Sequence, residues 1–317
     1  MRSEFEFIRN IKEKYGLSRV GDDCAVLPQN ALKDLIVTAD LLVEDIDFRI
    51  EWTRPELLGH KALAVSLSDI AAMGGTPRWA MLSIGIPFHM WKKGNFLDKF
   101  YQGWFELAKR FGVELVGGDV SRTPDQIVID SVVGGEVQRG NAIMRTGARP
   151  GDSIFVTGSL GGAAAGLELL ESGTRYGKSR GRKKDLLLRQ LSPTPRVEIG
   201  KHISSRKLAT SMIDISDGLG ADLHHLCESS GVGARIDAGL IPIDKNISDF
   251  TFDEIQRFAL ASGEDFELLF TSNSKTLSSI KSTPVTLIGE ITSSTGIVEL
   301  ASRERTILLP RSGYRHF

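Results

Sequence analysis

Hydrophobic residues recur along this chain in two patterns, which predict alternating helices and strands. Residues 4–15 and 95–110 repeat apolar side chains at helical spacing, and helices are also expected at 197–203 and 219–228. Short apolar runs bounded by turn residues predict strands at 24–27, 35–38, 79–86, 113–116, 127–134, 153–157, 212–215 and the apolar end of 261–270. Helices that alternate with strands in this way are typical of α/β proteins.

A long run of small and apolar residues, GHKALAVSLSDIAAMGG, occupies residues 59–75. It predicts a core segment, either a helix or a strand followed by a helix, and it contains one carboxylate, Asp69. Burial of an unpaired carboxylate is unfavourable, so Asp69 requires a strong partner. A helix cap or a hydrogen bond to a neighbouring serine would satisfy a single aspartate.

Asp69 is not an isolated case, because five further segments place acidic residues beside apolar runs. They are GDDCAVL at 21–27, TADLL at 38–42, GGDVSR at 117–122, DISDGLG at 214–220 and SGEDFELLF at 262–270. Singly, Asp22 and Asp23 fit a solvated turn, and Ser216 or Asp217 fits a helix N-cap. Together, these carboxylates beside glycine-rich backbone predict oxygen ligands for hard cations, with a phosphate-bearing ligand between them.

The signal at 113–119 is more specific than a single aspartate. We expect a buried strand at 113–116 that runs directly into Gly117-Gly118-Asp119. Two glycines would let a bulky ligand lie against the backbone, and the carboxylate that follows would face that ligand.

The composition indicates a globular protein with two domains. At 317 residues the chain exceeds the usual size of one core, and the turn-rich segment 141–152 suggests domains at 1–140 and 141–317. The net charge of −1 provides no basic field for nucleic acid, and two cysteines are too few for a disulfide framework. The sequence shows no signal peptide and no uncharged apolar stretch of membrane-spanning length, so we expect a cytoplasmic protein without a membrane partner.

Three basic or glycine-rich features have two interpretations each. Arg145, beside the domain junction, could reach a phosphate or form a surface ion pair. The glycine-rich turn at 158–166 could hold an anion at a helix N-terminus, or could serve close packing of helix and strand. The basic segment 171–189 is expected to be a solvated, mobile loop, with a phosphate-attracting lid as the alternative.

The residues point to phosphoryl transfer rather than to covalent catalysis. No Ser-His-Asp or Cys-His arrangement is evident, and we predict neither a nucleophilic side chain nor a general base. A cluster of carboxylates would repel a nucleotide, but divalent cations would bind the carboxylates and bridge the phosphates. The pattern therefore predicts a magnesium-dependent, ATP-using enzyme without a Walker motif.

The same motifs reveal a family resemblance over nearly the whole chain. The chain resembles the thiamine-monophosphate kinases of the aminoimidazole ribonucleotide synthetase superfamily. The motifs that carry the resemblance are GDDCAVL (21–27), TAD (38–40), KALAVSLSDIAAMGG (61–75), LVGGD (115–119), RTGARPGD (145–152), VTGSLGGAAAGL (156–167), IDISDGL (213–219), SGEDFELLF (262–270) and GYRHF (313–317).

The resemblance implies transfer of the ATP γ-phosphoryl group to thiamine monophosphate, giving thiamine diphosphate and ADP, with several Mg²⁺ ions. It implies magnesium ligands at Asp23, Thr38, Ala39 through its backbone, Asp40, Asp69, Asp119, Asp214 and Asp217. It implies ATP contacts at Tyr101, Gly118, Asp119, Arg145 and Ser216, and substrate contacts at Asp47, Glu264 and Tyr314. The family often has His at the position of Asp47 and Trp at that of Tyr314. The cationic thiazolium ring of thiamine suits Asp47 or Glu264 nearby and the face of Tyr314.

The resemblance also implies a fold and a partner. The N-terminal α/β domain is expected to pair with its copy in a homodimer, so that the two sheets form a barrel-like interface, and a C-terminal α/β domain is expected to cover the cleft. Two alternatives remain: another ATP-using enzyme of the superfamily, such as aminoimidazole ribonucleotide synthetase, or a non-catalytic nucleotide-binding module.

Overall fold

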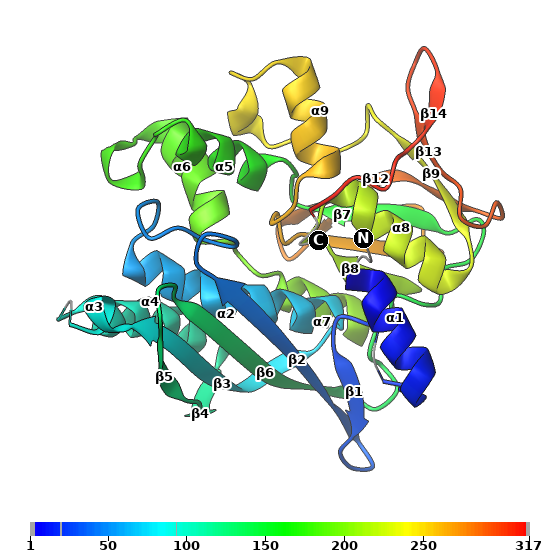
Figure 1. Cartoon of the computed structure of the whole chain (residues 1–317). Coiled ribbons are helices and arrows are strands. Elements are labelled where there is room, and N and C mark those ends of the chain that lie inside the picture. Colours follow the sequence, from blue (N-terminus) through cyan, green and yellow to red (C-terminus); the bar gives the residue numbers. More distant parts are fainter. Residues whose placement is uncertain (1–3, 20, 93, 315–317) are drawn as a thin grey trace.

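The computed structural model describes residues 4–19, 21–92 and 94–314 (Figure 1). The last three residues of the terminal GYRHF motif lie outside this described part. Two α/β halves, each built on one sheet, lie one above the other in Figure 1. The N-terminal half ends with a long strand at Gln138, and the C-terminal half begins with a strand at Ser153.

The N-terminal sheet is built around two long antiparallel strands. These are β2 (Lys33–Val43) and β6 (Val128–Gln138), which pair along their whole length. The strand order is β1-β2-β6-β3-β4, and β5 also pairs with β3. The remaining strands are β1 (Ala25–Pro28), β3 (Thr76–Pro87), β4 (Glu114–Gly117) and β5 (Val120–Thr123).

Helix α2 (Pro55–Ala72) lies between the two halves and is buried on nearly every side. It contacts β2 and β6 below it, helix α4 (Phe96–Phe111) beside it, and strand β8 of the other half. A helix that is apolar all round is typically buried in this way. Glycine permits the close approach of α4, because a Cβ added at Gly103 would lie 1.8 Å from the Glu56 carbonyl oxygen. The other helices of this half are α1 (Glu4–Tyr15) and the short α3 (Phe88–Trp91).

The C-terminal sheet has the strand order β14-β13-β9-β12-β7-β10-β8, and β11 pairs with β12. Its strands are β7 (Ser153–Thr157), β8 (Ser211–Asp214), β9 (Gly233–Asp237), β10 (Leu268–Ser272), β11 (Ser279–Ile280), β12 (Thr283–Thr292), β13 (Val298–Ala301) and β14 (Thr306–Leu308). Its helices are α5 (Gly162–Glu171), α6 (Gly181–Leu191), α7 (Val197–Ser205), α8 (Leu219–Ser230) and α9 (Phe252–Ala261), with 3-10 turns η1 (Tyr176–Lys178) and η2 (Lys245–Ile247).

Two sequence-based expectations about local structure are wrong. The basic segment 171–189 is not a loop throughout, because helix α6 begins at Gly181 and buries Leu186, Leu187 and Leu191. Arg182, Lys183 and Asp185 are exposed on the other side of this helix, whereas Arg189 points into the C-terminal half. The strand expected to be buried at 113–116 is β4, which is an edge strand, and its Val116 is 50% exposed.

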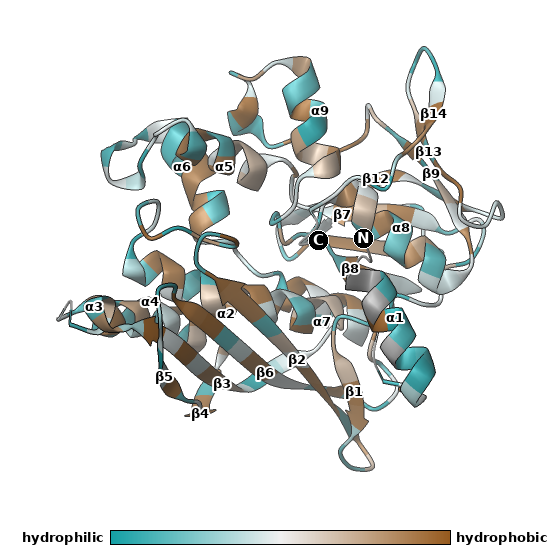
Figure 2. Cartoon of the chain, viewed as in Figure 1, coloured by the Kyte–Doolittle hydropathy of each residue, from teal (hydrophilic) through white to brown (hydrophobic). Residues whose placement is uncertain are grey.

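One face of the N-terminal sheet is covered by α2 and α4, and the opposite face is not covered by any described element. The alternation along β2 buries Ile36 and Thr38 on the α2 side, and it leaves Leu41 58% exposed on the other. Met81 on β3 and Val120 on β5 are also exposed. Figure 2 shows hydrophobic residues along β2, β6 and β3 on this side of the molecule.

Candidate active site

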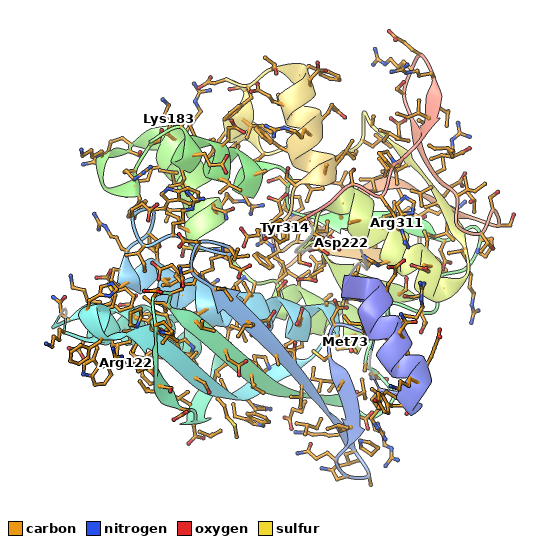
Figure 3. The ribbon with its side chains drawn as sticks, viewed as in Figure 1. Met73, Arg122, Lys183, Asp222, Arg311 and Tyr314 are labelled. Carbon is orange, nitrogen blue, oxygen red and sulfur yellow. The ribbon has the colours of Figure 1, made fainter. Side chains whose placement is uncertain are left out.

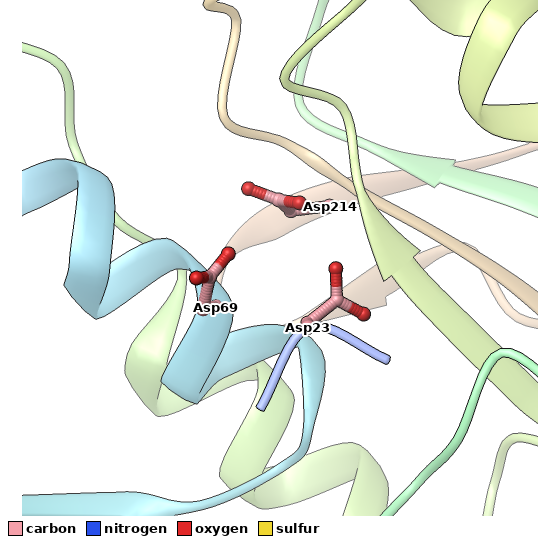
Figure 4. A group of neighbouring side chains, drawn as sticks. All are labelled: Asp23, Asp69 and Asp214. Carbon is pink, nitrogen blue, oxygen red and sulfur yellow. The ribbon is translucent and has the colours of Figure 1, made fainter. Parts of the chain in front are cut away.

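Three aspartates from distant parts of the chain form an acidic cluster at the junction of the two halves (Figure 4). Asp23 lies in the turn before β1, Asp69 lies near the C-terminal end of α2, and Asp214 is the last residue of β8. One carboxylate oxygen from each lies within 4.8 Å of the others. This spacing is suited to a shared cation, because each carboxylate offers a hard oxygen ligand.

Hydroxyl groups hold these carboxylates in place. Thr38 Oγ1 donates a hydrogen bond to Asp69 Oδ2, so the partner of Asp69 is a residue of β2 and not a neighbouring serine. Ser68 Oγ donates to Asp214 Oδ2 at 2.5 Å, which joins α2 to the C-terminal half. Ser66 Oγ donates to Asp40 Oδ2 at 2.7 Å, which places a fourth carboxylate beside α2.

The cluster carries more negative charge than the protein compensates. Burial, followed by repulsion from Asp23, raises the pKa of Asp214 to about 7. Burial also raises the pKa of Asp40 to about 6, and burial together with Asp40, Asp214 and Asp23 holds the pKa of Asp69 well above its usual range. Like charges that share a desolvated site favour protonation in this way, and a bound cation relieves the repulsion.

Arg145 is the cationic side chain beside this cluster. Its Nη2 lies 2.7 Å from Asp23 Oδ1, and its backbone N–H donates to Asp22 Oδ1 at 2.7 Å. The neighbouring carboxylates hold the pKa of Arg145 above its ordinary value despite burial. Of the two interpretations of Arg145, the ion pair is present, but it is made at the acidic cluster and not on the outer surface.

The turn that carries Ser216 and Asp217 is held by a residue that the sequence did not single out. Asp222, only 2% exposed, accepts hydrogen bonds from the backbone N–H of Asp217 at 3.2 Å and of Gly218 at 3.0 Å. The capping interpretation of Ser216 and Asp217 is wrong, because Gly218 is the N-cap of α8. The sequence could have indicated the role of Asp222, because an acidic residue in the first turn of a helix often accepts hydrogen bonds from the backbone N–H groups at the helix start.

A cavity of about 560 Å³ opens beside the cluster and is lined by both halves of the chain. Six of the predicted site residues line it, namely Asp40, Asp47, Ser216, Asp217, Glu264 and Tyr314. The lining is strongly acidic, with Asp40, Asp45, Asp47, Glu168, Glu171, Asp217 and Glu264 against Arg49, Lys61 and Arg257. Aromatic side chains also line it, among them Phe48, Trp52 and Tyr314. Such a cavity favours a cationic, flat ligand.

The predicted substrate residues lie together in this cavity. The Tyr314 backbone N–H donates to the Asp217 carbonyl oxygen at 3.1 Å, and Figure 3 labels Tyr314 near the junction of the halves. Burial, with Asp47, Glu264 and Asp217, raises the pKa of the Tyr314 phenol. The Asp47 carboxylate accepts a hydrogen bond from the Val43 N–H at 2.8 Å.

Sequence reasoning missed the partners of Glu264. Its carboxylate forms an ion pair with Lys61 Nζ at 2.6 Å and accepts a hydrogen bond from Gln190 Nε2. The sequence itself indicates that Lys61 has an acidic partner, because a lysine inside an apolar helix is buried and is rarely buried unpaired. Gln190 carried no such signal, since it follows a run of leucines and basic residues in α6.

Four predicted site residues, namely Ala39, Gly118, Asp119 and Tyr101, neither place a side chain at the acidic cluster nor line the cavity. Ala39 is exposed on the outer face of the sheet, as expected for a residue that takes part only through its backbone. Gly118 lies against Leu82 of β3. Leu82 pairs with Ser131 of β6, and Ser131 pairs with Asp40 of β2. Three strand spacings, or about 14 Å, therefore separate Gly118 and Asp119 from Asp40.

Tyr101 is the fourth of these residues. It lies on α4, half-buried, with its ring against those of Phe100 and Phe105. Burial raises the pKa of its phenol.

The glycine-rich turn at 158–166 already holds an anion from the protein. The Asp265 carboxylate accepts hydrogen bonds from the N–H groups of Gly161 at 2.7 Å and Ala163 at 3.2 Å, at the start of α5. Arg189 lies 3.3 Å from Asp265, and beside them Arg196 holds the fully buried Glu267 through two contacts of 2.6 and 2.5 Å. This second, balanced cluster supports the packing interpretation of the turn.

Comparisons with known proteins agree with this geometry. The family model described as AIR synthase related protein, N-terminal domain, matches residues 21–137, and the corresponding C-terminal domain model matches residues 149–300. The thiamine-monophosphate kinase of Bacillus subtilis is 36% identical over 94% of this chain and 93% of its own length. That of Escherichia coli K12 is 36% identical over 99% and 98%.

Solved structures give the same result. A structure described as AaThiL complexed with AMPPCP and TMP matches with a TM-score of 0.88 and 33% identity, over 99% of this chain and 97% of that one. The thiamine-monophosphate kinase of Stenotrophomonas maltophilia K279a matches with a TM-score of 0.79 and 34% identity, over 95% and 96%. Within the described residues, no helix combines the length and the apolar character needed to cross a membrane. The expected family and two-domain fold are thus confirmed, and the chain belongs to the thiamine-monophosphate kinase family of enzymes.

Proposed function

We propose that this protein transfers the γ-phosphoryl group of ATP to the phosphate of thiamine monophosphate, giving thiamine diphosphate and ADP. The observation that carries the proposal is the position of the acidic cluster beside an acidic cavity with aromatic walls. The cluster suits the phosphate end of the reaction, and the cavity suits a cationic acceptor ring. Relatives of similar length that bear this enzyme's name support the same assignment.

The residues present fit magnesium, because the donor set consists of carboxylates whose repulsion is uncompensated. Asp23, Asp69 and Asp214 would hold Mg²⁺, with Asp40, Asp217, Thr38 and the Ala39 backbone as further predicted ligands. When bound, the metal supplies positive charge that offsets the repulsion between two phosphate groups.

The protein's own groups orient the two substrates. Arg145 and Ser216 lie on the nucleotide side of the proposed site, and Asp47, Glu264 and Tyr314 lie around the proposed acceptor ring. The nucleophile is an oxygen of the acceptor phosphate, which is largely ionised at neutral pH because its second pKa is about 6. An in-line transfer of this kind requires no general base, in agreement with the sequence-based prediction of none.

We also propose that the protein acts as a homodimer through the uncovered apolar face of the N-terminal sheet. Leu41, Met81, Val116 and Val120 are 45–58% exposed in a single copy, and a contiguous exposed apolar face of this kind marks an interaction surface. Two such faces would pack into the expected barrel-like interface. Because Asp119 is about 14 Å from Asp40 within one copy, we propose that Gly118 and Asp119 serve the site of the second copy.

The proposed reaction is tested with purified protein, Mg-ATP and thiamine monophosphate, with ADP and thiamine diphosphate followed by chromatography. We expect one thiamine diphosphate per ADP and no product from free thiamine. ADP without thiamine diphosphate would contradict this acceptor and would favour another enzyme of the superfamily, to be tried with formylglycinamidine ribonucleotide. ATP binding with neither product would favour a non-catalytic module.

A further inference from the structure

Lys61 is a buried cation in the middle of α2, and only 3% of its surface is exposed. Its Nζ lies 2.6 Å from Glu264 Oε1 and 3.4 Å from the Asp47 carbonyl oxygen. Lysine is rarely buried this completely unless it is paired. Its two contacts are to residues from opposite halves of the chain, and both residues line the cavity.

The Glu264 end of this pair is held from several sides. Its second carboxylate oxygen accepts a hydrogen bond from Gln190 of α6, and its backbone N–H donates to the Ser216 carbonyl oxygen at 2.8 Å. Its φ of 66° lies in the left-handed region, which a glutamate adopts only when its surroundings enforce it. The carboxylate is therefore a fixed part of the cavity wall, and its charge is matched by Lys61.

Helix α2 also fixes the position of Lys61 relative to Asp69 of the acidic cluster. Lys61, Val65 and Asp69 follow one another at intervals of four residues, so they lie along one side of α2. The rise per residue puts Lys61 about 12 Å from Asp69 along the helix axis. One helix thus connects the cluster to the far end of the cavity.

We propose that Lys61 is a positioning residue for the acceptor, a role that rests on the proposed function. Its ammonium group neutralises Glu264 and joins the Glu264 segment to the Asp47 segment across the cavity. Of the acidic residues that line the cavity, Glu264 is therefore already neutralised when a cationic acceptor ring enters. Lys61 itself does not contact the transferred phosphoryl group.

If Lys61 acts through its charge, variants of the Lys61–Glu264 pair should differ in a way that a pure packing role would not produce. Glu264→Gln leaves the ammonium group of Lys61 unpaired beside a cationic ligand, and Lys61→Met leaves the Glu264 carboxylate unpaired. Glu264→Gln should raise KM and Kd for thiamine monophosphate about tenfold, because the unpaired ammonium group repels the cationic ring. Lys61→Met should raise them less, because the freed Glu264 carboxylate attracts that ring even though its segment is no longer joined to that of Asp47. KM for ATP should change less than about twofold, because the nucleotide side is untouched. The double variant K61M/E264Q leaves neither charged group unpaired, so it should bind the acceptor more tightly than E264Q alone.

The experiment measures Kd of thiamine monophosphate by calorimetry without ATP, and KM and kcat in the coupled reaction, for these variants and for Lys61→Arg. Lys61→Arg keeps the charge and should recover most of the lost affinity. The matched control is the exposed pair Lys281 and Glu198, whose variants K281M, E198Q and K281M/E198Q should leave acceptor binding unchanged. Thermal unfolding identifies any variant that fails to fold, and if K61M fails, E264Q and K61R still decide the question.

The proposal would be overturned if the double variant bound thiamine monophosphate more weakly than either single variant, with the two losses of affinity multiplied. It would also be overturned if the variants raised KM for ATP as much as KM for thiamine monophosphate. If the wild-type protein makes no thiamine diphosphate but the Kd values follow the predicted order, the proposed function fails and the role of Lys61 stands. If the wild type does not bind thiamine monophosphate at all, both proposals fail.

Discussion

The acidic cluster and the balanced cluster are both buried assemblies of charge, and they differ in their balance. Among the described residues, Asp23, Asp69 and Asp214 have one cationic neighbour, Arg145, whereas Asp244, Asp265 and Glu267 share two, Arg189 and Arg196. The second set has two arginines for three carboxylates and many hydrogen bonds, so it is close to balance and has a structural role. An unmatched set of carboxylates requires positive charge from elsewhere, so the difference in balance separates the site from the scaffold.

Removal of one carboxylate from the unmatched cluster should impair the enzyme most. Asp69→Asn should lower kcat/KM about a thousandfold, because a ligand to the charge-neutralising cation is lost. The same change removes a source of repulsion, so the melting temperature of the metal-free protein should stay constant or rise. Magnesium titrations of turnover and thermal unfolding measure the two effects. Unchanged magnesium dependence would contradict the assignment of Asp69 as a metal ligand.

The balanced cluster should respond in the opposite way. Arg196→Met leaves the fully buried Glu267 with only Arg189 at 3.4 Å and the Thr157 hydroxyl at 2.8 Å, and it should lower the free energy of unfolding by about 3 kcal/mol. Folded enzyme below the melting temperature should keep its activity per molecule. Denaturant unfolding and active-site titration test this pair of outcomes, and the exposed Lys281→Met control should lower stability by less than about 1 kcal/mol. A loss of activity without a loss of stability would show that the balanced cluster belongs to the site.

A third prediction concerns whether one chain contains the whole unmatched cluster. If Asp119 serves the site of the second copy, D69N and D119N chains should complement each other when mixed and allowed to exchange subunits. Random assortment places one intact site in each mixed dimer, so activity should recover to about a quarter of the wild-type value. Separately purified variants and a D69N/D119N double variant serve as controls. No recovery after demonstrated subunit exchange would assign Asp119 to its own chain or to no site.

Asp214 should also make the stability of the metal-free protein depend on pH, without any effect on turnover being required. Burial raises the pKa of Asp214 on folding from 3.8 to about 7, so the folded chain binds this proton more tightly than the unfolded chain. The stabilisation is therefore complete below about pH 4 and is lost as the pH rises toward 7. In EDTA, Asp214→Asn should become increasingly more stable than the wild type as the pH rises from 4 to 7, and thermal unfolding measures this gap. A gap that stays constant with pH would contradict the raised pKa.

The sequence was informative where one residue type recurs in one local context. Asp23, Asp69 and Asp214 each lie beside an apolar run, and their common pattern predicted a common site before any geometry was known. Their partners could not be predicted, because Ser68, for example, contacts Asp214 across 146 positions. For Lys61 an acidic partner could be expected, but only the fold identifies that partner as Glu264. Long-range pairing of this kind leaves no local pattern.

The errors in secondary structure arose from reading composition without context. The many charges at 171–189 predicted a loop, but a helix needs only one apolar side, and Leu186, Leu187 and Leu191 provide it. The apolar residues of β4 predicted a buried strand, but a strand at the edge of an uncovered sheet can expose Val116. Burial of a strand depends on what covers the sheet, and that is settled by tertiary and quaternary contacts.

The eight-residue interval between Lys61 and Asp69 has a consequence for how this chain can vary in length. Inserting or deleting one residue between them would rotate one side chain relative to the other by about 100° around the helix axis. Lys61 would then leave Glu264, or Asp69 would leave Thr38 and the cluster. Loops around the cavity can accept insertions, whereas this part of α2 should tolerate substitutions but no change in length.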